Sequence, residues 1–410
     1  MSSRRLDLVV FLDAPELGPA RPVGVLTRWS GPILSVAFAY ARSWLQDTAR
    51  RFAIDPALPL DELRVTVPGR RIPGIFQDTT PDRWGEALLV RRAGGRALGP
   101  WEFLVGVADE TRMGALRLRL GVDGPFIAGR EPAVPSVHRL PELQELARRF
   151  EDDPCKVSDA RIAMLVAPGS SLGGMRPKAN FVAADGGLWI AKFPSGADRL
   201  DVAAWEQVYA CLARAAGIAV SETELLAIAG PRRTFATRRF DRTVDGRRLY
   251  ASALTLTARA DARDADYIDI VQAISDHGAS RHVRDDLAQL YRRMAFNVLA
   301  GNRDDHLRNH GFLRHADGWR LAAAFDLNPA REMREHSTAI NGTVVAPSAA
   351  DVLAARSFFG LSDRGARSII REVAAAVGEW RRIATATGIE RSEQQQVAGA
   401  LAALDTAARI

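Results

Sequence analysis

Three oxygen-bearing side chains around residue 310 have the types and the spacing that phosphoryl transfer needs. Asp304 lies in the run Gly-Asn-Arg-Asp-Asp-His-Leu-Arg-Asn, which ends at Asn309, and Asp326 follows in the apolar run Ala-Ala-Ala-Phe-Asp-Leu. Protein kinases use this order: an Asp accepts the proton of the acceptor hydroxyl, and an Asn and a later Asp hold magnesium. Mg²⁺ prefers such hard oxygen ligands. The sequence therefore predicts an ATP- and Mg²⁺-dependent phosphotransferase, with Asp304 as the catalytic residue and Asn309 and Asp326 as metal ligands.

A polar loop capped by Asp and Asn is the simpler alternative for this run. It fits poorly, because the run follows a helical apolar pattern that starts at Leu287, and because Asp326 lies among apolar residues. We expect His306 to contact the nucleotide or to support a residue that does. A metal-binding role for His306 would need a cluster of His and Asp residues that we do not find in the sequence.

Lysine is the second informative feature, because only three of the 55 Lys and Arg residues are lysines. Such a composition keeps Lys where a compact ammonium is needed and a planar guanidinium does not fit. Lys178 closes a Gly- and Ser-rich run that begins at Ser170, in which adjacent glycines would let backbone N–H groups approach phosphate. Lys192 ends an apolar strand pattern, where kinases place the lysine for the α- and β-phosphates. The alternatives are an ordinary glycine turn and a solvent-exposed lysine.

A further set of candidate nucleotide contacts lies at the end of the strand pattern Thr-Arg-Arg-Phe-Asp, although a polar turn explains these residues equally well. Glu206 lies in the predicted helix that follows the strand of Lys192. Two interpretations are equally open for it: an ion pair with Lys192, or a helix residue that faces solvent. The residues that we expect to contact ATP are Gly173, Gly174, Met175, Arg176, Lys178, Lys192, Arg238, Arg239, Phe240, Asp241, His306 and Asp326.

The patterns of apolar residues predict an α+β, protein-kinase-like bilobal fold. Alternation at 114–120 is typical of a strand, and helical spacing over 140–150 and 201–216 predicts helices. The order loop, strand, strand, helix, strand, strand is that of a kinase small lobe. We expect an N-terminal α/β subdomain at 1–124, a proline-containing linker at 125–137, a small lobe at 138–245 and a mainly helical C-terminal lobe at 246–410.

Composition bounds the class of protein. Hydrophobic residues make up 47% of the chain, which argues against disorder, and no apolar run approaches the ~18 residues of a membrane-spanning helix. Cys155 and Cys211 are too few for a disulfide framework and lack metal-ligand spacing. The net charge of +6 permits nucleic-acid contact, but an Arg-rich composition explains it more simply. We expect a cytoplasmic protein with no membrane partner.

Five motifs in shared order resemble those of the HipA family, the kinase toxins of bacterial toxin–antitoxin pairs. The glycine run is similar to the family's phosphate loop, Ile-Ala-Lys-Phe-Pro to its lysine strand, and Arg-Arg-Phe-Asp-Arg to its lobe-junction motif. Asn-Arg-Asp-Asp-His-Leu-Arg-Asn resembles the catalytic loop, and Ala-Phe-Asp-Leu the metal-binding segment. Upstream, Phe-Ala-Tyr, Trp-Leu, Leu-Pro-Leu and Pro-Asp-Arg-Trp-Gly resemble the family's N-terminal subdomain.

The resemblance implies a Ser/Thr protein kinase whose target is an aminoacyl-tRNA synthetase or another translation component. It also implies a small helix-turn-helix antitoxin similar to HipB, through which the complex reaches operator DNA. In the family, a Ser at the head of the phosphate loop can be autophosphorylated, which silences the kinase. Ser171 matches that position, and Ser170 is the neighbouring candidate.

The sequence departs from the family's pattern at two places, and its Gly-Gly-x-Arg-Pro-Lys form resembles a separate branch of the family. Arg176-Pro177-Lys178 stands where better-studied members carry Gln-Glu-Lys, and Arg238 replaces a Glu. Two other functions stay open: a small-molecule phosphotransferase on the same fold, and an inactive kinase that acts with an antitoxin as a DNA corepressor. The intact set of two aspartates and one asparagine argues against the second.

Overall fold

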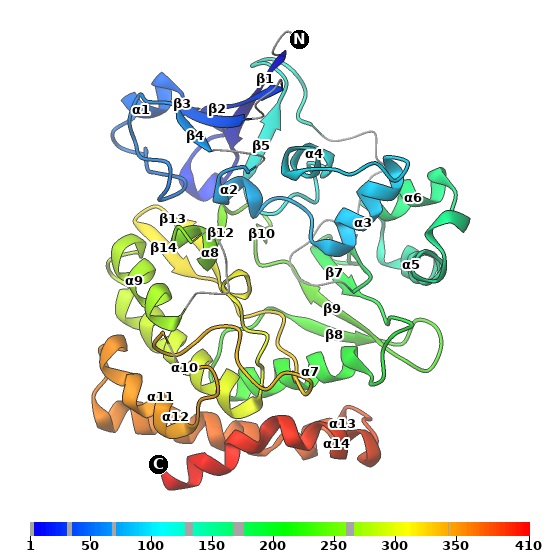
Figure 1. Cartoon of the computed structure of the whole chain (residues 1–410), viewed down its shortest axis with the longest axis vertical. Helices are drawn as coiled ribbons and strands as arrows, with labels where there is room; N and C mark the ends of the chain where they lie inside the picture. The colour runs from blue at the N-terminus through cyan, green and yellow to red at the C-terminus, as the bar shows by residue number, and fades with distance from the viewer. Residues whose placement is uncertain are drawn as a thin grey trace. The chain divides into compact units, whose positions relative to one another are not determined.

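The computed structural model describes residues 4–30, 35–67, 71–127, 134–166, 176–259, 266–342 and 344–410. The chain divides into two compact units. The first comprises Met1–Gly196 and Asp241–Ala251, and the second comprises Ala197–Phe240 and Ser252–Ile410. Both helices and sheets are present, which agrees with the expected α+β class (Figure 1).

The first unit contains a five-stranded antiparallel sheet in the order β4-β3-β2-β1-β5. Alternating residues place one side of each strand in the core: in β5, Leu116 and Leu118 are buried, whereas Arg117 and Arg119 are half-buried. The strand predicted at 114–120 is thereby confirmed. The bounds are β1 Arg4–Leu12, β2 Arg21–Ser30, β3 Ser35–Tyr40, β4 Val65–Val67 and β5 Leu116–Arg119.

Short helices accompany this sheet in the first unit, and the longest of them is strongly amphipathic. Leu143, Ala147 and Phe150 recur at helical spacing on the buried side of α5, as the sequence predicts. The helices are α1 Arg42–Gln46, α2 Gly74–Gln77, α3 Arg83–Arg92, α4 Pro100–Gly106, α5 Leu140–Asp152 and α6 Asp159–Val166, and the 3-10 turns are η1 Pro15–Leu17, η2 Val137–Arg139 and η3 Pro154–Lys156.

Two hairpins complete the first unit. β6 (Lys178–Val182) pairs antiparallel with β7 (Leu188–Lys192), and this register places Lys178 directly opposite Lys192. The small hairpin β10 (Arg242–Thr243) and β11 (Gly246–Arg247) belongs to the segment that returns to this unit. β12 (Tyr250–Ser252) lies where the chain passes into the second unit.

The second unit is mainly helical, and α10 (Val283–Ala300) runs through its core. Tyr209, Phe296 and Ile370, from three different helices, are all completely buried. The other helices of this unit are α7 Val202–Ala215, α8 Ala253–Leu256, α9 Tyr267–His277, α11 Ala349–Ala354, α12 Asp363–Gly378, α13 Trp380–Ala386 and α14 Arg391–Ala398, and the 3-10 segments are η4 Leu307–Asn309, η5 Ala355–Phe359 and η6 Gly399–Arg409 (Figure 1).

Two antiparallel hairpins belong to the second unit. β8 (Thr223–Leu226) pairs with β9 (Thr234–Arg238), and these are the last two strands of the order that the sequence predicts for the small lobe. β13 (Gly311–His315) pairs with β14 (Gly318–Leu321) directly after the predicted catalytic loop. The mainly helical pattern expected after residue 250 agrees with the helices of this unit, and the second hairpin is an addition that the sequence did not predict. Its strands are too short for a periodic pattern to stand out. Among the described residues, no helix is both long and apolar enough to cross a membrane.

Candidate active site

The loop that carries Asp304 is fixed at its start by a glycine. Gly301 ends α10 with a φ of 68°, a left-handed conformation that glycine adopts without a steric penalty. A Cβ at this position would lie 2.0 Å from the backbone oxygen of Ala400, so no other residue fits. The Arg303 guanidinium donates to the carbonyl of Ala330 at 3.3 Å and to that of Ala400 at 3.1 Å. Gly301 and Arg303 therefore both hold the segment after α10 against Ala400 in η6.

Asp304 and Asn309 lie on the two ends of this loop, and one hydrogen bond joins them. The Asp304 side chain is exposed, and its Oδ1 accepts a long hydrogen bond of 3.5 Å from the Ser337 hydroxyl. Nδ2 of Asn309 donates to the backbone oxygen of Asp304 at 2.7 Å. This contact fixes the orientation of the Asn309 amide and leaves its Oδ1 as the atom that can bind a cation. Asp304, by contrast, is open to an incoming hydroxyl.

Asp326 has an unusual backbone conformation. Its φ is 59°, and among the described residues Ala258 is the only other non-glycine residue with a positive φ. Left-handed backbone costs a residue with a Cβ about 1–2 kcal/mol, and such strain concentrates at functional sites. Phe325, its neighbour, lines a small cavity together with Asp305 and Asn309. The two segments that the sequence singled out therefore adjoin each other in the second unit.

The donor atoms of this region fit the expected metal. An amide oxygen from Asn309 and a carboxylate from Asp326 are hard ligands, and Mg²⁺ accepts one or two carboxylates alongside phosphate oxygens and water. His306 presents an Nδ1 atom that is buried and has no hydrogen-bond partner among the described residues. Its expected role beside the nucleotide stays a prediction, as do the metal-binding roles of Asn309 and Asp326.

Asp305 is a residue that the sequence analysis missed. Its side chain is 1% exposed, and its Oδ2 accepts a hydrogen bond from the Tyr267 hydroxyl at 2.7 Å. Its backbone oxygen accepts from Thr338 at 2.8 Å and lies 3.2 Å from Nε2 of His310. Burial lowers the pKa of His310 to about 4, so this ring is neutral at physiological pH. Two consecutive aspartates after Arg303 were the available signal for a buried acid. Here Asp304 faces solvent and Asp305 faces the core.

Lys178, the expected phosphate contact, is engaged by a carboxylate in the first unit. Its side chain is 1% exposed, and its ammonium donates to Oδ2 of Asp82. Oδ1 of Asp82 accepts the backbone N–H of Gly85 at 3.0 Å and so caps α3. Nε1 of Trp84 donates to the backbone oxygen of Lys178 at 3.2 Å. The run Pro-Asp-Arg-Trp-Gly thus holds the strand that follows the predicted phosphate loop, a role that its sequence did not reveal.

This buried pair leads to a stability prediction. Asp82→Asn should keep the helix cap, because Asn caps as well as Asp, but it leaves the Lys178 ammonium buried without its counter-charge. We expect a loss of about 3–5 kcal/mol in the free energy of unfolding, measured by urea denaturation. Asp201→Asn is the matched control: Asp201 also caps a helix and pairs with Arg233 at 2.8 Å, but that pair is partly exposed. Equal small losses in the two variants would contradict the prediction.

Lys192 lies beside this pair. It is 8% exposed, and the β6–β7 register places it opposite Lys178. Like charges at directly opposed positions repel, so a nearby carboxylate or phosphate stabilises the hairpin. The Arg176 guanidinium donates to the backbone oxygen of Phe193 at 3.3 Å. Glu206 is buried in α7 of the second unit, and its pairing with Lys192 stays a prediction.

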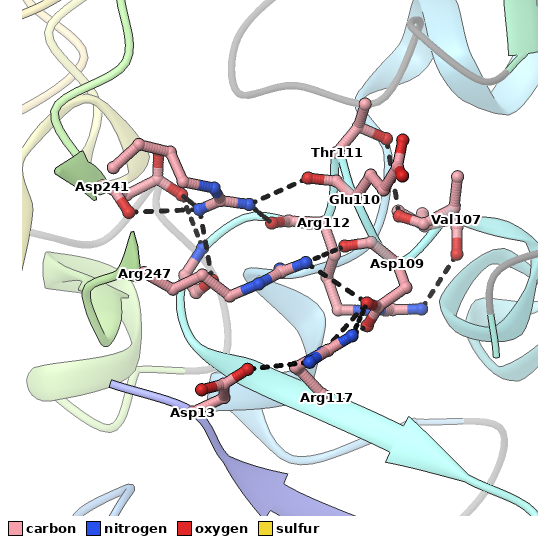
Figure 2. A network of polar contacts seen from close by, with 12 residues as sticks. Asp13, Val107, Asp109, Glu110, Thr111, Arg112, Arg117, Asp241 and Arg247 are labelled. Atoms are coloured by element: carbon pink, nitrogen blue, oxygen red, sulfur yellow. Dashed lines mark hydrogen bonds and ion pairs between the residues drawn. The ribbon is translucent and has the colours of Figure 1, made fainter. Parts of the chain in front are cut away.

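Asp241, predicted at the nucleotide, is enclosed in a network of the first unit (Figure 2). Its carboxylate is completely buried and accepts from the backbone N–H of Gly114 at 2.7 Å and from Nη1 of Arg242 at 2.5 Å. Figure 2 also shows Asp109 between two arginines: Arg117 lies 2.5 Å from it and Arg247 3.2 Å. Asp241 therefore has structural partners that the sequence did not suggest, and its contact with ATP is still untested.

The other candidates of that strand end belong to the second unit. Arg238 pairs with Glu222 at 3.1 Å, and Arg239 is buried. The rings of Phe240 and Phe325 pack with centroids 5.5 Å apart, so the strand end lies beside the segment that carries Asp326. Five further candidates, which are Ser170, Ser171, Gly173, Gly174 and Met175, lie outside the described residues.

Comparisons with family models match two regions of the chain. Family models match residues 170–380, as a HipA-like C-terminal domain, and residues 18–119, as a HipA N-terminal domain. The chain belongs to the HipA family. Comparison with curated proteins gives no match.

Among solved structures, HipA of Shewanella oneidensis MR-1, determined in complex with HipB and its operator DNA, matches with a TM-score of 0.70. The sequence identity is 17%, and the match covers 98% of this chain and 96% of that one. The Helicobacter pylori proinflammatory kinase CtkA matches with a TM-score of 0.39 at 16% identity, over 55% of this chain and 96% of that one. The HipA fold confirms the kinase-like α+β class.

Proposed function

We propose that this HipA-family protein is an ATP-dependent Ser/Thr protein kinase. The observation that supports this most directly is the pairing of an exposed catalytic carboxylate with a fixed amide. Asp304 faces solvent, while Asn309 is tied to the backbone of Asp304 and adjoins the segment of Asp326. A hydroxyl acceptor needs an accessible base, and a nucleotide phosphate needs a metal held close to that base.

Each residue has one role in the proposed transfer. Asp304 orients the acceptor hydroxyl and accepts its proton as the bond to the γ-phosphorus forms. Asn309 and Asp326 hold Mg²⁺, which when bound neutralises charge on the phosphates. Lys192 binds the α- and β-phosphates, and Arg176, His306 and residues 173–175 add further contacts to the nucleotide. The bond from the γ-phosphorus to the β,γ-bridging oxygen breaks, and ADP leaves.

The proposed substrate is a protein hydroxyl, in an aminoacyl-tRNA synthetase or another translation component. The proposed partner is a small helix-turn-helix antitoxin, because the Shewanella HipA was solved with HipB and operator DNA. On this proposal operator DNA is reached only through the antitoxin. A gel-shift assay tests the point: this chain alone should leave operator DNA unshifted, and it should add to the shift that the antitoxin produces.

The test of the proposed function is transfer from γ-labelled ATP with Mg²⁺ to a cell extract and to a panel of small hydroxyl compounds. Label in protein supports the proposal, whereas label only in small molecules supports a small-molecule phosphotransferase. If Mg·ATP gives no transfer and does not raise the melting temperature, the inactive corepressor is favoured. Mass spectrometry of the same reaction tests autophosphorylation, since Ser171 or Ser170 should carry phosphate and activity should then decay.

Lys192→Arg should damage transfer although it keeps the charge. The site is 8% exposed and faces a second lysine, so a larger planar guanidinium has no room there. We expect kcat/KM for ATP to fall by about tenfold or more, measured on protein whose melting temperature is close to that of the wild type. Lys156→Arg is the matched control, because Lys156 is 84% exposed and should tolerate the change. Full activity in the Lys192 variant would assign that lysine to structure alone.

A further inference from the structure

A continuous chain of hydrogen bonds in the second unit, buried except at its partly buried first bond, connects the segment that follows the predicted metal ligand with the residue beside the predicted catalytic Asp. The backbone N–H of Asn328 donates to Oδ1 of Asn302 at 3.3 Å. Nδ2 of Asn302 donates to Oδ1 of Asn297 at 2.9 Å. Nδ2 of Asn297 donates to the Tyr267 hydroxyl at 2.9 Å, and this hydroxyl donates to Oδ2 of Asp305 at 2.7 Å.

The donors of this chain all point the same way, toward a carboxylate. Reversing either amide would set donor against donor, so the direction of the chain fixes both Asn side chains. Hydrogen bonds in such a series polarise one another, and the last one is strengthened by the charge of its acceptor. Burial and the Asp305 carboxylate raise the pKa of Tyr267 well above its usual value, so its hydroxyl stays a donor.

The chain crosses several elements that are separate in sequence. Tyr267 begins α9, Asn297 lies in the last turn of α10, and Asn302 and Asp305 lie in the catalytic loop. All four side chains are at most 3% exposed. The removal of one link therefore leaves its neighbours without their protein partner.

We propose that Tyr267 is a positioning residue for phosphoryl transfer, whose hydroxyl holds the loop of Asp304 in register with the segment of Asp326. The other groups in this series of hydrogen bonds belong to the loop of Asp304, to the segment of Asp326 or to α10. The Tyr267 hydroxyl comes from α9 instead, and it makes the last hydrogen bond of the series, to Asp305. Without it, the loop can shift against the metal-binding segment while the fold persists. This inference rests on the proposed kinase function, because it concerns the geometry of the same site.

The test compares two single-atom deletions in the same unit. Tyr267→Phe removes the link, whereas Tyr291→Phe removes an equally buried hydroxyl that donates to the backbone oxygen of Val352 at 3.0 Å. Both variants should lose similar melting temperature. Only Tyr267→Phe should lower kcat, by about tenfold, since one orphaned buried partner corresponds to a rate factor of that order. It should also raise the Mg²⁺ concentration needed for half-maximal rate, which a purely structural role would not move.

A second variant tests the chain from its other end. Asn302→Ala should reproduce the loss of kcat, and combining it with Tyr267→Phe should add little further loss, because both interrupt the same chain. Equal kcat and equal Mg²⁺ dependence in the Tyr267 and Tyr291 variants, or fully additive losses in the double variant, would overturn the inference. Wild-type protein that transfers no phosphate would instead overturn the proposed function, so the two failures are distinguishable.

Discussion

Asp304→Asn should abolish phosphoryl transfer while ATP still binds. The variant keeps the size of the side chain and removes the group that accepts the hydroxyl proton. Positioned proton transfer contributes about 10²–10⁴-fold to rate, so kcat should fall by roughly a thousandfold. The nucleotide should bind almost unchanged, because on our proposal Asp304 touches the acceptor and not ATP. Rapid-quench transfer assays and calorimetry with Mg·ATP measure the two effects separately.

The exposure of Asp304 makes this substitution clean. Its side chain faces solvent and accepts, among the described residues, only one long hydrogen bond, so stability should not change measurably. Asp317→Asn is a suitable control, since Asp317 is an exposed acid at the turn between β13 and β14 and should tolerate the change. Near-normal transfer by the Asp304 variant would show that another group accepts the proton.

Asp326→Ala should remove the Mg²⁺-dependent part of ATP binding as well as activity. Losing a metal carboxylate weakens the clamp on the phosphates by several kcal/mol, so the affinity for ATP in the presence of Mg²⁺ should fall by on the order of a hundredfold. Titration calorimetry with and without Mg²⁺ separates this part from the metal-independent contacts. Unchanged affinity for Mg·ATP in this variant would contradict the assignment of Asp326 as a metal ligand.

Because the backbone of Asp326 is left-handed, a second variant can remove the carboxylate without lowering stability. Asp326→Gly also removes the carboxylate, but it relieves a φ of 59° that costs any residue with a Cβ. We expect this variant to melt at least as high as the wild type and to lose Mg·ATP binding as fully as the Ala variant does. A metal-binding defect in a stabilised protein cannot be blamed on unfolding.

Local patterns in the sequence were sufficient to predict several elements of the fold. The alternation in β5 and the apolar spacing in α5 and α7 each report burial of one side, which depends only on neighbours along the chain. The predicted chemistry of the Asp304 region also depended only on residues close together in the sequence. The strands β13 and β14 were missed because four or five residues leave little room for a period.

Partners distant in sequence could not be predicted. Asp82 and Lys178 are 96 residues apart, Gly114 and Asp241 are 127 apart, and Tyr267 and Asp305 are 38 apart. A periodic pattern indicates that a side chain is buried, but it does not say which side chain it meets. Buried polar groups require a partner, so each of these residues could be flagged, yet the identity of the partner emerges only from the fold.

The contact between Gly301 and Ala400 has a consequence for the order of synthesis. The loop of Asp304 packs against the backbone of η6. Gly301 approaches the carbonyl of Ala400 closely, and the Arg303 guanidinium donates a hydrogen bond to the same carbonyl. A ribosome makes residue 400 about a hundred residues after it makes this loop, so the loop is translated long before its support exists. A nascent chain would therefore emerge with its predicted nucleotide contacts already made and the loop of Asp304 still unsupported. On the proposed function, the kinase would gain its activity only after η6 has been synthesised.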